Sequence, residues 1–179
     1  MDDSVKFDRY YNLTLRYLSY RPHSEKEVMD YLKDKLKSQK SSVRRTQDKQ
    51  VKIEIQNEKS TDDLINQIIT KLKEYKFIDD TDFTKFWIQQ RTKFKPKPIW
   101  IIESELKQKG ISKDVIDEVL LEFDEKKSLD EESAKKLAEK KMDFYRGLDP
   151  KKRREKVINY LLRRGFSYDL VKKIEILSQ

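Results

Sequence analysis

The sequence predicts an all-α protein made of three tandem three-helix repeats. Apolar residues recur at helical spacing along almost the whole chain, as at Val28, Leu32 and Leu36. These apolar stripes return in register when the chain is shifted along itself by about fifty residues. With 36% hydrophobic and 41% charged residues, the chain suits thin helical layers, so we expect a flat or elongated shape.

Composition excludes several classes of function. There is no cysteine, which removes disulfides, thiolate nucleophiles and cysteine zinc sites, and the single histidine excludes a histidine-rich metal site. Three glycines leave little material for a phosphate-binding loop. No apolar run resembles a membrane span or a signal segment, so we expect a cytoplasmic protein. The net charge of +8 favours an anionic partner.

Two self-alignments define the repeat. A shift of 51 residues pairs Leu64/Val115, Ile65/Ile116, Ile68/Val119, Asp79/Asp130 and Phe83/Ala134. A shift of 55 residues pairs Ile102/Val157, Leu106/Leu161, Gly110/Gly165, Ile116/Val171 and Val119/Ile174. We therefore expect units at residues 1–78, 79–129 and 130–179.

The first unit departs from this pattern through a polar insertion at residues 37–60. The insertion lacks glycine and proline, and VKIEI at residues 51–55 alternates as a short strand would. We interpret it as a mobile arm or a weak hairpin.

Tight corners are predicted where Gly110 and Gly165 end a helix, because glycine adopts the left-handed conformation without strain. The serine two residues after each glycine is a natural N-cap for the next helix. Apolar pairs flank both caps as hydrophobic staples: Ile111/Ile116 and Phe166/Val171.

The second helix of each unit has its own start signal. Ser24 and Glu27 have the spacing of a capping box. Pro98 suits the first helical position, and Asp149 is expected to cap a helix that begins with Pro150.

The stretch FIDDTDFTKFWIQQR at residues 77–91 crowds three carboxylates beside a tryptophan and an arginine. Asp79 is predicted to be the N-cap of a helix, with Asp82 three residues later and Ile78 facing Phe83 as a staple. Asp80 then lies in the first turn, near the positive helix end. The repeat keeps this pattern at Leu129, Asp130 and Ser133. A metal or acid-base site would need further converging ligands, so capping is the favoured interpretation.

Three other residues are candidate functional groups. His23, between Pro22 and Ser24, is expected to be an exposed turn residue, since no nucleophile motif accompanies it. Trp87 is expected to pack in the core or between units. For Trp100, packing and nucleobase stacking both remain open.

Two basic segments are candidate binding surfaces. RTKFKPKPIW interleaves cations with aromatic rings, as a nucleic-acid platform does, although a stiff link between helices would have the same composition. KKRREK and LLRRG place further cations on one helix, where a solvated face is the alternative. The candidate contacts are Arg91, Lys93, Lys95, Lys97, Lys152, Arg153, Lys156, Arg163 and Arg164, with Phe94 and Trp100 as candidate stacking rings.

Three motifs together resemble the RecX regulatory proteins. YLSYRPHSEKEVMDYLKDKL is similar to the family's opening, and ESELKQKGIS is similar to its Glu-Leu-x-x-Lys-Gly-Ile turn. FIDDTDFTKFWIQQR resembles the family signature Ile-Asp-Asp-x-x-Phe-Ala-x-x-Trp-x-x-x-Arg, with Thr84 in place of alanine. The resemblance runs from about Asp8 to Leu177. Larger relatives carry an additional N-terminal segment, which implies a short member or a truncated chain here.

The resemblance implies an elongated, curved body of three units and a monomeric, non-enzymatic regulator without cofactors. Such a protein would bind the RecA recombinase filament on DNA and inhibit strand exchange, ATP hydrolysis and co-protease activity, within DNA repair and the SOS response. Two rival hypotheses come from the residues themselves. One is a DNA-binding helical module that acts without a recombinase, and the other is a metal-dependent hydrolase built on Asp79, Asp80 and Asp82.

Overall fold

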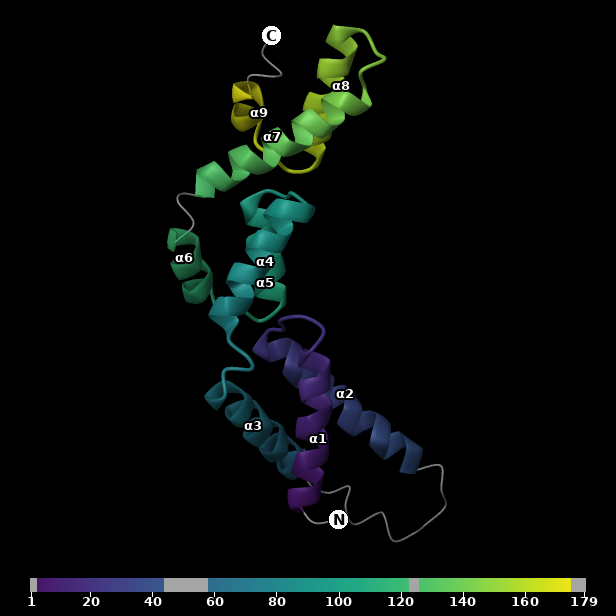
Figure 1. The fold of residues 1–179 in the computed structure, drawn as a ribbon, viewed down its shortest axis with the longest axis vertical. Helices are drawn as coiled ribbons and strands as arrows, with labels where there is room; N and C mark the ends of the chain where they lie inside the picture. The colour runs from purple at the N-terminus through teal and green to yellow at the C-terminus, as the bar shows by residue number, and fades with distance from the viewer. Residues whose placement is uncertain (1–2, 44–57, 123–125, 175–179) are drawn as a thin grey trace. The chain divides into compact units, whose positions relative to one another are not determined.

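The computed structural model describes residues 3–43, 58–122 and 126–174, which form nine helices and no strand (Figure 1). The helices are α1 (Asp3–Leu18), α2 (Glu25–Val43), α3 (Glu58–Glu74), α4 (Asp80–Phe94), α5 (Ile99–Gln108), α6 (Lys113–Glu122), α7 (Lys126–Phe144), α8 (Pro150–Arg163) and α9 (Tyr168–Lys173). The prediction of an all-α fold is confirmed.

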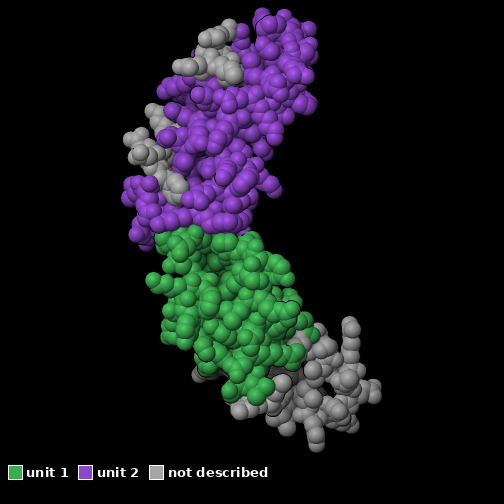
Figure 2. Space-filling view, in the orientation of Figure 1, with its two compact units in different colours: residues 1–83 green, residues 84–179 purple. Residues whose placement is uncertain are grey.

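The helices pack as two compact units, residues 1–83 and residues 84–179 (Figure 2). Helix α4 begins in unit 1 and continues in unit 2. The finer division at residues 79 and 130 stays a prediction.

Unit 1 buries the apolar stripes of α2 and α3 against α1. Val28, Leu32 and Leu36 line α2 and are almost completely buried, as are Ile68 and Leu72 on α3. Full burial of a side chain of this size is worth about 1.5–3 kcal/mol. The helical spacing recognised in the sequence is therefore the packing face of this unit.

Unit 2 contains a second core, in which α7, α8 and α9 meet. Val157 and Leu161 of α8 are fully buried, and Ala134 and Ala138 present the matching face of α7. Alanine side chains let two helix backbones approach closely. Phe166 closes this core at the corner before α9.

The two glycine corners have the predicted geometry. Gly110 and Gly165 have φ angles of 86° and 92°, in the left-handed region. The N–H groups of Ile111 and Phe166 donate to the carbonyls five residues earlier, at 3.1 and 3.2 Å, as in a Schellman motif. Ser112 and Ser167 then accept from backbone N–H groups three residues on, each at 3.3 Å.

A third corner of this kind ends α3, and the sequence signals did not reveal it. Lys76 has a φ angle of 54°, and the next residue, Phe77, donates its N–H to the Leu72 carbonyl at 2.8 Å. The bonding pattern is that of the glycine corners, but a lysine occupies the left-handed position. A side chain is strained there by about 1–2 kcal/mol.

Several local predictions need correction. Pro98 is the N-cap of α5 and does not occupy its first turn. His23 is not an exposed turn residue, since it is only 4% exposed. The centroid of its ring lies 3.9 Å from that of Tyr17. In the predicted arm or hairpin, residues 37–43 are the last part of α2 and residues 58–60 are the first part of α3. The rest of it lies outside the described residues.

The self-alignment shifts by one residue after α6. Helix α7 starts at Lys126, so Asp130 lies inside it and the predicted N-cap at Asp130 is wrong. Burial instead matches at a spacing of 50. At this spacing both residues of each of the following pairs, one in α4 and one in α7, are buried: Phe83/Ser133, Thr84/Ala134 and Ile88/Ala138.

We expect Lys76→Gly to stabilise the protein by about 1 kcal/mol, because glycine relieves the left-handed strain. Urea unfolding measures the change. Gln67→Gly, at an exposed position inside α3, is the matched control and should cost about 1 kcal/mol. Equal losses in the two variants would contradict this account of the corner.

Candidate interaction surfaces

The Glu105 carboxylate organises one predicted set of cations. Its Oε2 accepts a hydrogen bond from Trp87 Nε1 at 2.9 Å and from Arg91 Nε at 2.6 Å. Lys97 Nζ forms an ion pair with the other carboxylate oxygen. Arg91 and Lys97 are therefore engaged inside unit 2.

Two cations lie close to the indole ring of Trp87. The Arg91 guanidinium lies 4.1 Å from the centroid of the indole, and Lys109 Nζ lies 4.2 Å from it. Trp87 is half-buried, whereas Phe83 and Ile88 supply the fully buried positions of α4. Trp87 is thus packed in a cation–π and ion-pair cluster within unit 2. Of its two predicted places, the core is wrong, and packing between the repeats stays a prediction.

The charge state of Glu105 follows from these contacts. Burial by itself raises the pKa of this carboxyl group. The hydrogen bonds from Lys97, Arg91 and Trp87 together outweigh burial and lower the pKa of Glu105 below its usual value. The carboxylate is held ionised, and it stabilises the segment between α4 and α5.

Three predicted contacts remain exposed in this segment: Lys93, Phe94 and Lys95. Phe94 is 64% exposed, and Lys93 Nζ lies 5.5 Å from the centroid of its ring. The segment links α4 and α5 and exposes two cations and a ring, and the choice between a link and a nucleic-acid platform stays a prediction.

Trp100 packs against the corner between α8 and α9. Its Nε1 donates to the Gly165 carbonyl at 3.0 Å. A Cβ atom placed on Gly165 would lie 2.9 Å from Trp100 Cζ2 and 3.3 Å from Ile101 Cδ1. This position explains why glycine is needed there, and it commits the indole N–H to packing within unit 2.

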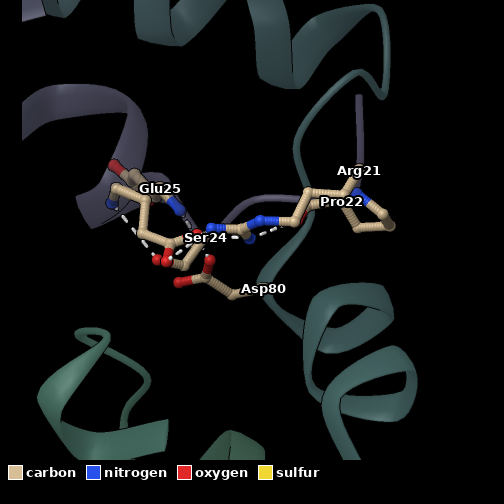
Figure 3. Close-up of polar contacts among 6 residues, drawn as sticks. Arg21, Pro22, Ser24, Glu25 and Asp80 are labelled. Carbon is tan, nitrogen blue, oxygen red and sulfur yellow. Dashed lines mark hydrogen bonds and ion pairs between the residues drawn. The ribbon is translucent and has the colours of Figure 1, made fainter. Parts of the chain in front are cut away.

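Two aspartates cap helices far from their own sequence positions. Asp80 Oδ1 accepts from the N–H of Glu25 at 2.9 Å, and Figure 3 shows its carboxylate beside the start of α2. Asp130 Oδ1 accepts in the same way from the N–H of Ile99 at 2.6 Å. Burial raises the pKa of both carboxyl groups. Because of its bond to Glu25, Asp80 caps α2 and also lies in the first turn of its own helix, α4.

Asp79 and Ser24 have the predicted roles. The Asp79 carboxylate accepts from the N–H groups of Thr81 and Asp82 at 2.7 and 3.1 Å, so the N-cap of α4 is confirmed. Ser24 Oγ accepts from the N–H of Glu27 at 3.2 Å, while the Glu27 carboxylate also pairs with Arg21. Within the described ranges, no group of three or more acidic or histidine side chains could hold a metal ion.

The predicted cations of α8 lie along that helix and at its C-terminal end. Lys152, Lys156, Arg163 and Arg164 are exposed, and Arg153 is half-buried. Asp149 accepts from Lys151 N and Lys152 N at 3.1 and 3.3 Å, with Pro150 next in the chain, so the predicted start of α8 is confirmed. Their contact with a partner stays a prediction.

Sequence reasoning missed a group of aromatic rings that lies beside these cations. Lys141 Nζ of α7 lies 4.7, 5.8 and 4.8 Å from the ring centroids of Phe144, Tyr145 and Tyr160. The cations of α8 were predicted, but their excess over the acids of α8 and α9 was not. Residues 150–173 contain nine cationic and two acidic residues, a net charge of +7 out of the chain's +8. A count of charges per helix would have found it.

The helices that the structure describes are too short or too polar for a membrane span. In the ranges that the structure covers, none is long and apolar enough to cross a bilayer.

The fold and these surfaces define a class: a helical protein of short three-helix units that presents cationic and aromatic side chains. Three family models match the chain, described as the first, second and third three-helix domains of RecX, at residues 11–38, 79–120 and 130–174. Together they match well over half of the chain. The chain belongs to the RecX family of regulatory proteins.

Similar proteins carry the same name. "Regulatory protein RecX" of Bacillus licheniformis is 32% identical over 169 residues, which are 94% of this chain and 54% of that protein. The Streptococcus pyogenes serotype M5 protein is 33% identical over 163 residues, 90% of this chain and 52% of the relative. The chain thus spans about half the length of these relatives.

A solved structure extends the likeness to the fold. The crystal structure of RecX from Lactobacillus salivarius is 27% identical, with a TM-score of 0.64, and the match covers 96% of this chain and 95% of that one. The prediction of the family is confirmed.

We expect Glu105→Gln to lower the free energy of unfolding by about 1–3 kcal/mol at neutral pH, because Arg91 and Lys97 lose their anionic partner. The folded-state pKa of Glu105 is depressed, so its stabilisation is present above the unfolded-state pKa and is lost as the pH falls through the folded-state pKa. The gap between the two proteins should close on acidification.

Thermal unfolding over a series of pH values measures this gap. Glu118→Gln, which removes an exposed carboxylate from α6, is the control and should change little. A gap that stayed constant with pH would show that Glu105 contributes through shape and not through charge.

Gly165→Ala should destabilise the chain by about 2 kcal/mol or more, because the left-handed φ and the nearby Trp100 ring both oppose a Cβ atom. Gly147→Ala is the matched control, since a Cβ atom there meets nothing within 4 Å. Chemical denaturation with Trp fluorescence as the readout compares them. Similar midpoints for both variants would refute the packing of Trp100 on this corner.

Proposed function

We propose that this chain is a non-enzymatic regulator that binds the RecA recombinase filament on DNA and inhibits its activities in recombination and repair. Membership of the RecX family carries the proposal. In it the chain acts as a cytoplasmic monomer of three units, residues 1–78, 79–129 and 130–179, and needs no cofactor.

The distribution of charge supports a partner of this kind. A recombinase filament on DNA offers phosphates together with acidic protein surface. The +7 charge of residues 150–173 gives one part of this chain a strong attraction for such a surface. Lys93 and Lys95 add exposed cations in the same unit. Because charge dominates, binding should weaken steeply as salt is added.

The candidate cations differ in whether they already have partners within the protein. Arg91 and Lys97 are paired with Glu105, so their replacement would disturb the fold as well as any contact. Lys152 and Lys156 are exposed and one turn apart on α8. They are the better positions at which to test a contact.

The test uses DNA-dependent ATP hydrolysis by RecA at low salt. The wild-type chain should slow hydrolysis, and the double variant Lys152→Glu/Lys156→Glu should need at least about tenfold more protein for the same effect. Both positions are exposed, so this variant should fold.

Lys33→Glu/Lys37→Glu is the matched control. It reverses two exposed cations with the same spacing on α2 and should inhibit like the wild type. The proposal fails if the wild-type chain neither binds the filament nor changes ATP hydrolysis.

A further inference from the structure

Three aromatic rings and one ammonium group lie together where α7 ends. Lys141 Nζ is within 5.8 Å of the ring centroids of Phe144, Tyr145 and Tyr160. Phe144 and Tyr145 meet edge to face, with centroids 5.0 Å apart and planes at 78°. These four residues, Lys141, Phe144, Tyr145 and Tyr160, are called the ring cluster below.

The rings are differently exposed. Tyr145 and Tyr160 pack partly against the core of unit 2, which holds them in place. Phe144 is 70% exposed, so it adds little to that core. Isolated exposed apolar residues are common on proteins. A large exposed ring that lies against two anchored rings and a cation is a more specific arrangement.

Further cations extend the ring cluster along α8. Lys156 Nζ lies 5.5 Å from the centroid of Tyr145, and the Arg164 guanidinium lies 5.6 Å from that of Tyr160. Asp149, at the start of α8, already accepts from two backbone N–H groups. Rings and cations therefore lie together in the strongly positive part of the chain.

We infer that the ring cluster is a stacking site for the bases of single-stranded nucleic acid, with Lys156 and Arg164 bound to the neighbouring phosphates. An unpaired strand offers a negative charge at every nucleotide and an accessible base face beside it. A duplex hides its base faces, and an acidic protein surface would leave the rings unused. The site works without the recombinase and does not rest on the proposed function.

Fluorescence anisotropy of a labelled deoxythymidine strand of about 15 nucleotides, with no recombinase present, tests the inference. A duplex of equal length and an abasic strand with the same number of phosphates serve as comparison probes. The wild-type chain should prefer the base-bearing strand. Phe144→Ala should weaken that binding about tenfold and leave binding of the abasic strand unchanged, because it removes a stacking ring and no charge.

Three further variants sharpen the result. Phe144→Trp should retain binding, because it restores a ring. Tyr75→Ala removes a ring that is 62% exposed in unit 1 and should have no effect. Lys156→Ala should reduce the slope of log K against log salt by about 0.7 without changing the preference for bases.

Other outcomes would overturn the inference. Equal affinity for the abasic and base-bearing strands would mean that only charge is recognised. Tighter binding of the duplex, or displacement of the strand by polyglutamate at equal charge concentration, would point to a surface for duplex or for an acidic protein.

Discussion

The starts of α2 and α5 are held by carboxylates from much later in the chain, and the arrangement of each unit depends on these two bonds. Asp80 reaches Glu25 across 55 positions, and Asp130 reaches Ile99 across 31. A helix leaves its first four N–H groups without intrahelical partners, so each carboxylate satisfies a group that its own helix cannot. Because the acceptor belongs to another helix, the bond also fixes where that helix passes.

The positions of the acidic side chains also determine which cations are paired within the protein and which face the solvent. Glu105 engages Arg91 and Lys97, and with them Trp87, so these two cations are paired within unit 2, while Lys93 and Lys95 stay exposed. Helices α8 and α9 have few acids to do this, and almost the whole net charge of the chain collects there. A basic sequence therefore becomes one structural cluster and one accessible surface, which differ in what they can bind.

The repeats of this chain share their backbone corners and buried positions more than they share residue types. The corners at Gly110 and Gly165 use the same backbone bonds, and Lys76 uses them without glycine. The small residues Ala134 and Ala138 of α7 take the buried positions that Thr84 and Ile88 hold in α4. A single-residue change of spacing before α7 is absorbed because Asp130 keeps its role on α5 while its own helix starts earlier.

The sequence by itself determined the features that depend on neighbours within a few residues. Helical periodicity, the left-handed glycines and the caps at Ser24, Asp79 and Asp149 were all predictable, because a helix end is satisfied by atoms close along the chain. Tertiary structure decided the burial of His23, the contacts of Trp87 and Trp100, and the second role of Asp80. It also assembled the ring cluster from two helices. Each of these depends on a contact between different helices or corners, and such contacts form only once the helices have packed.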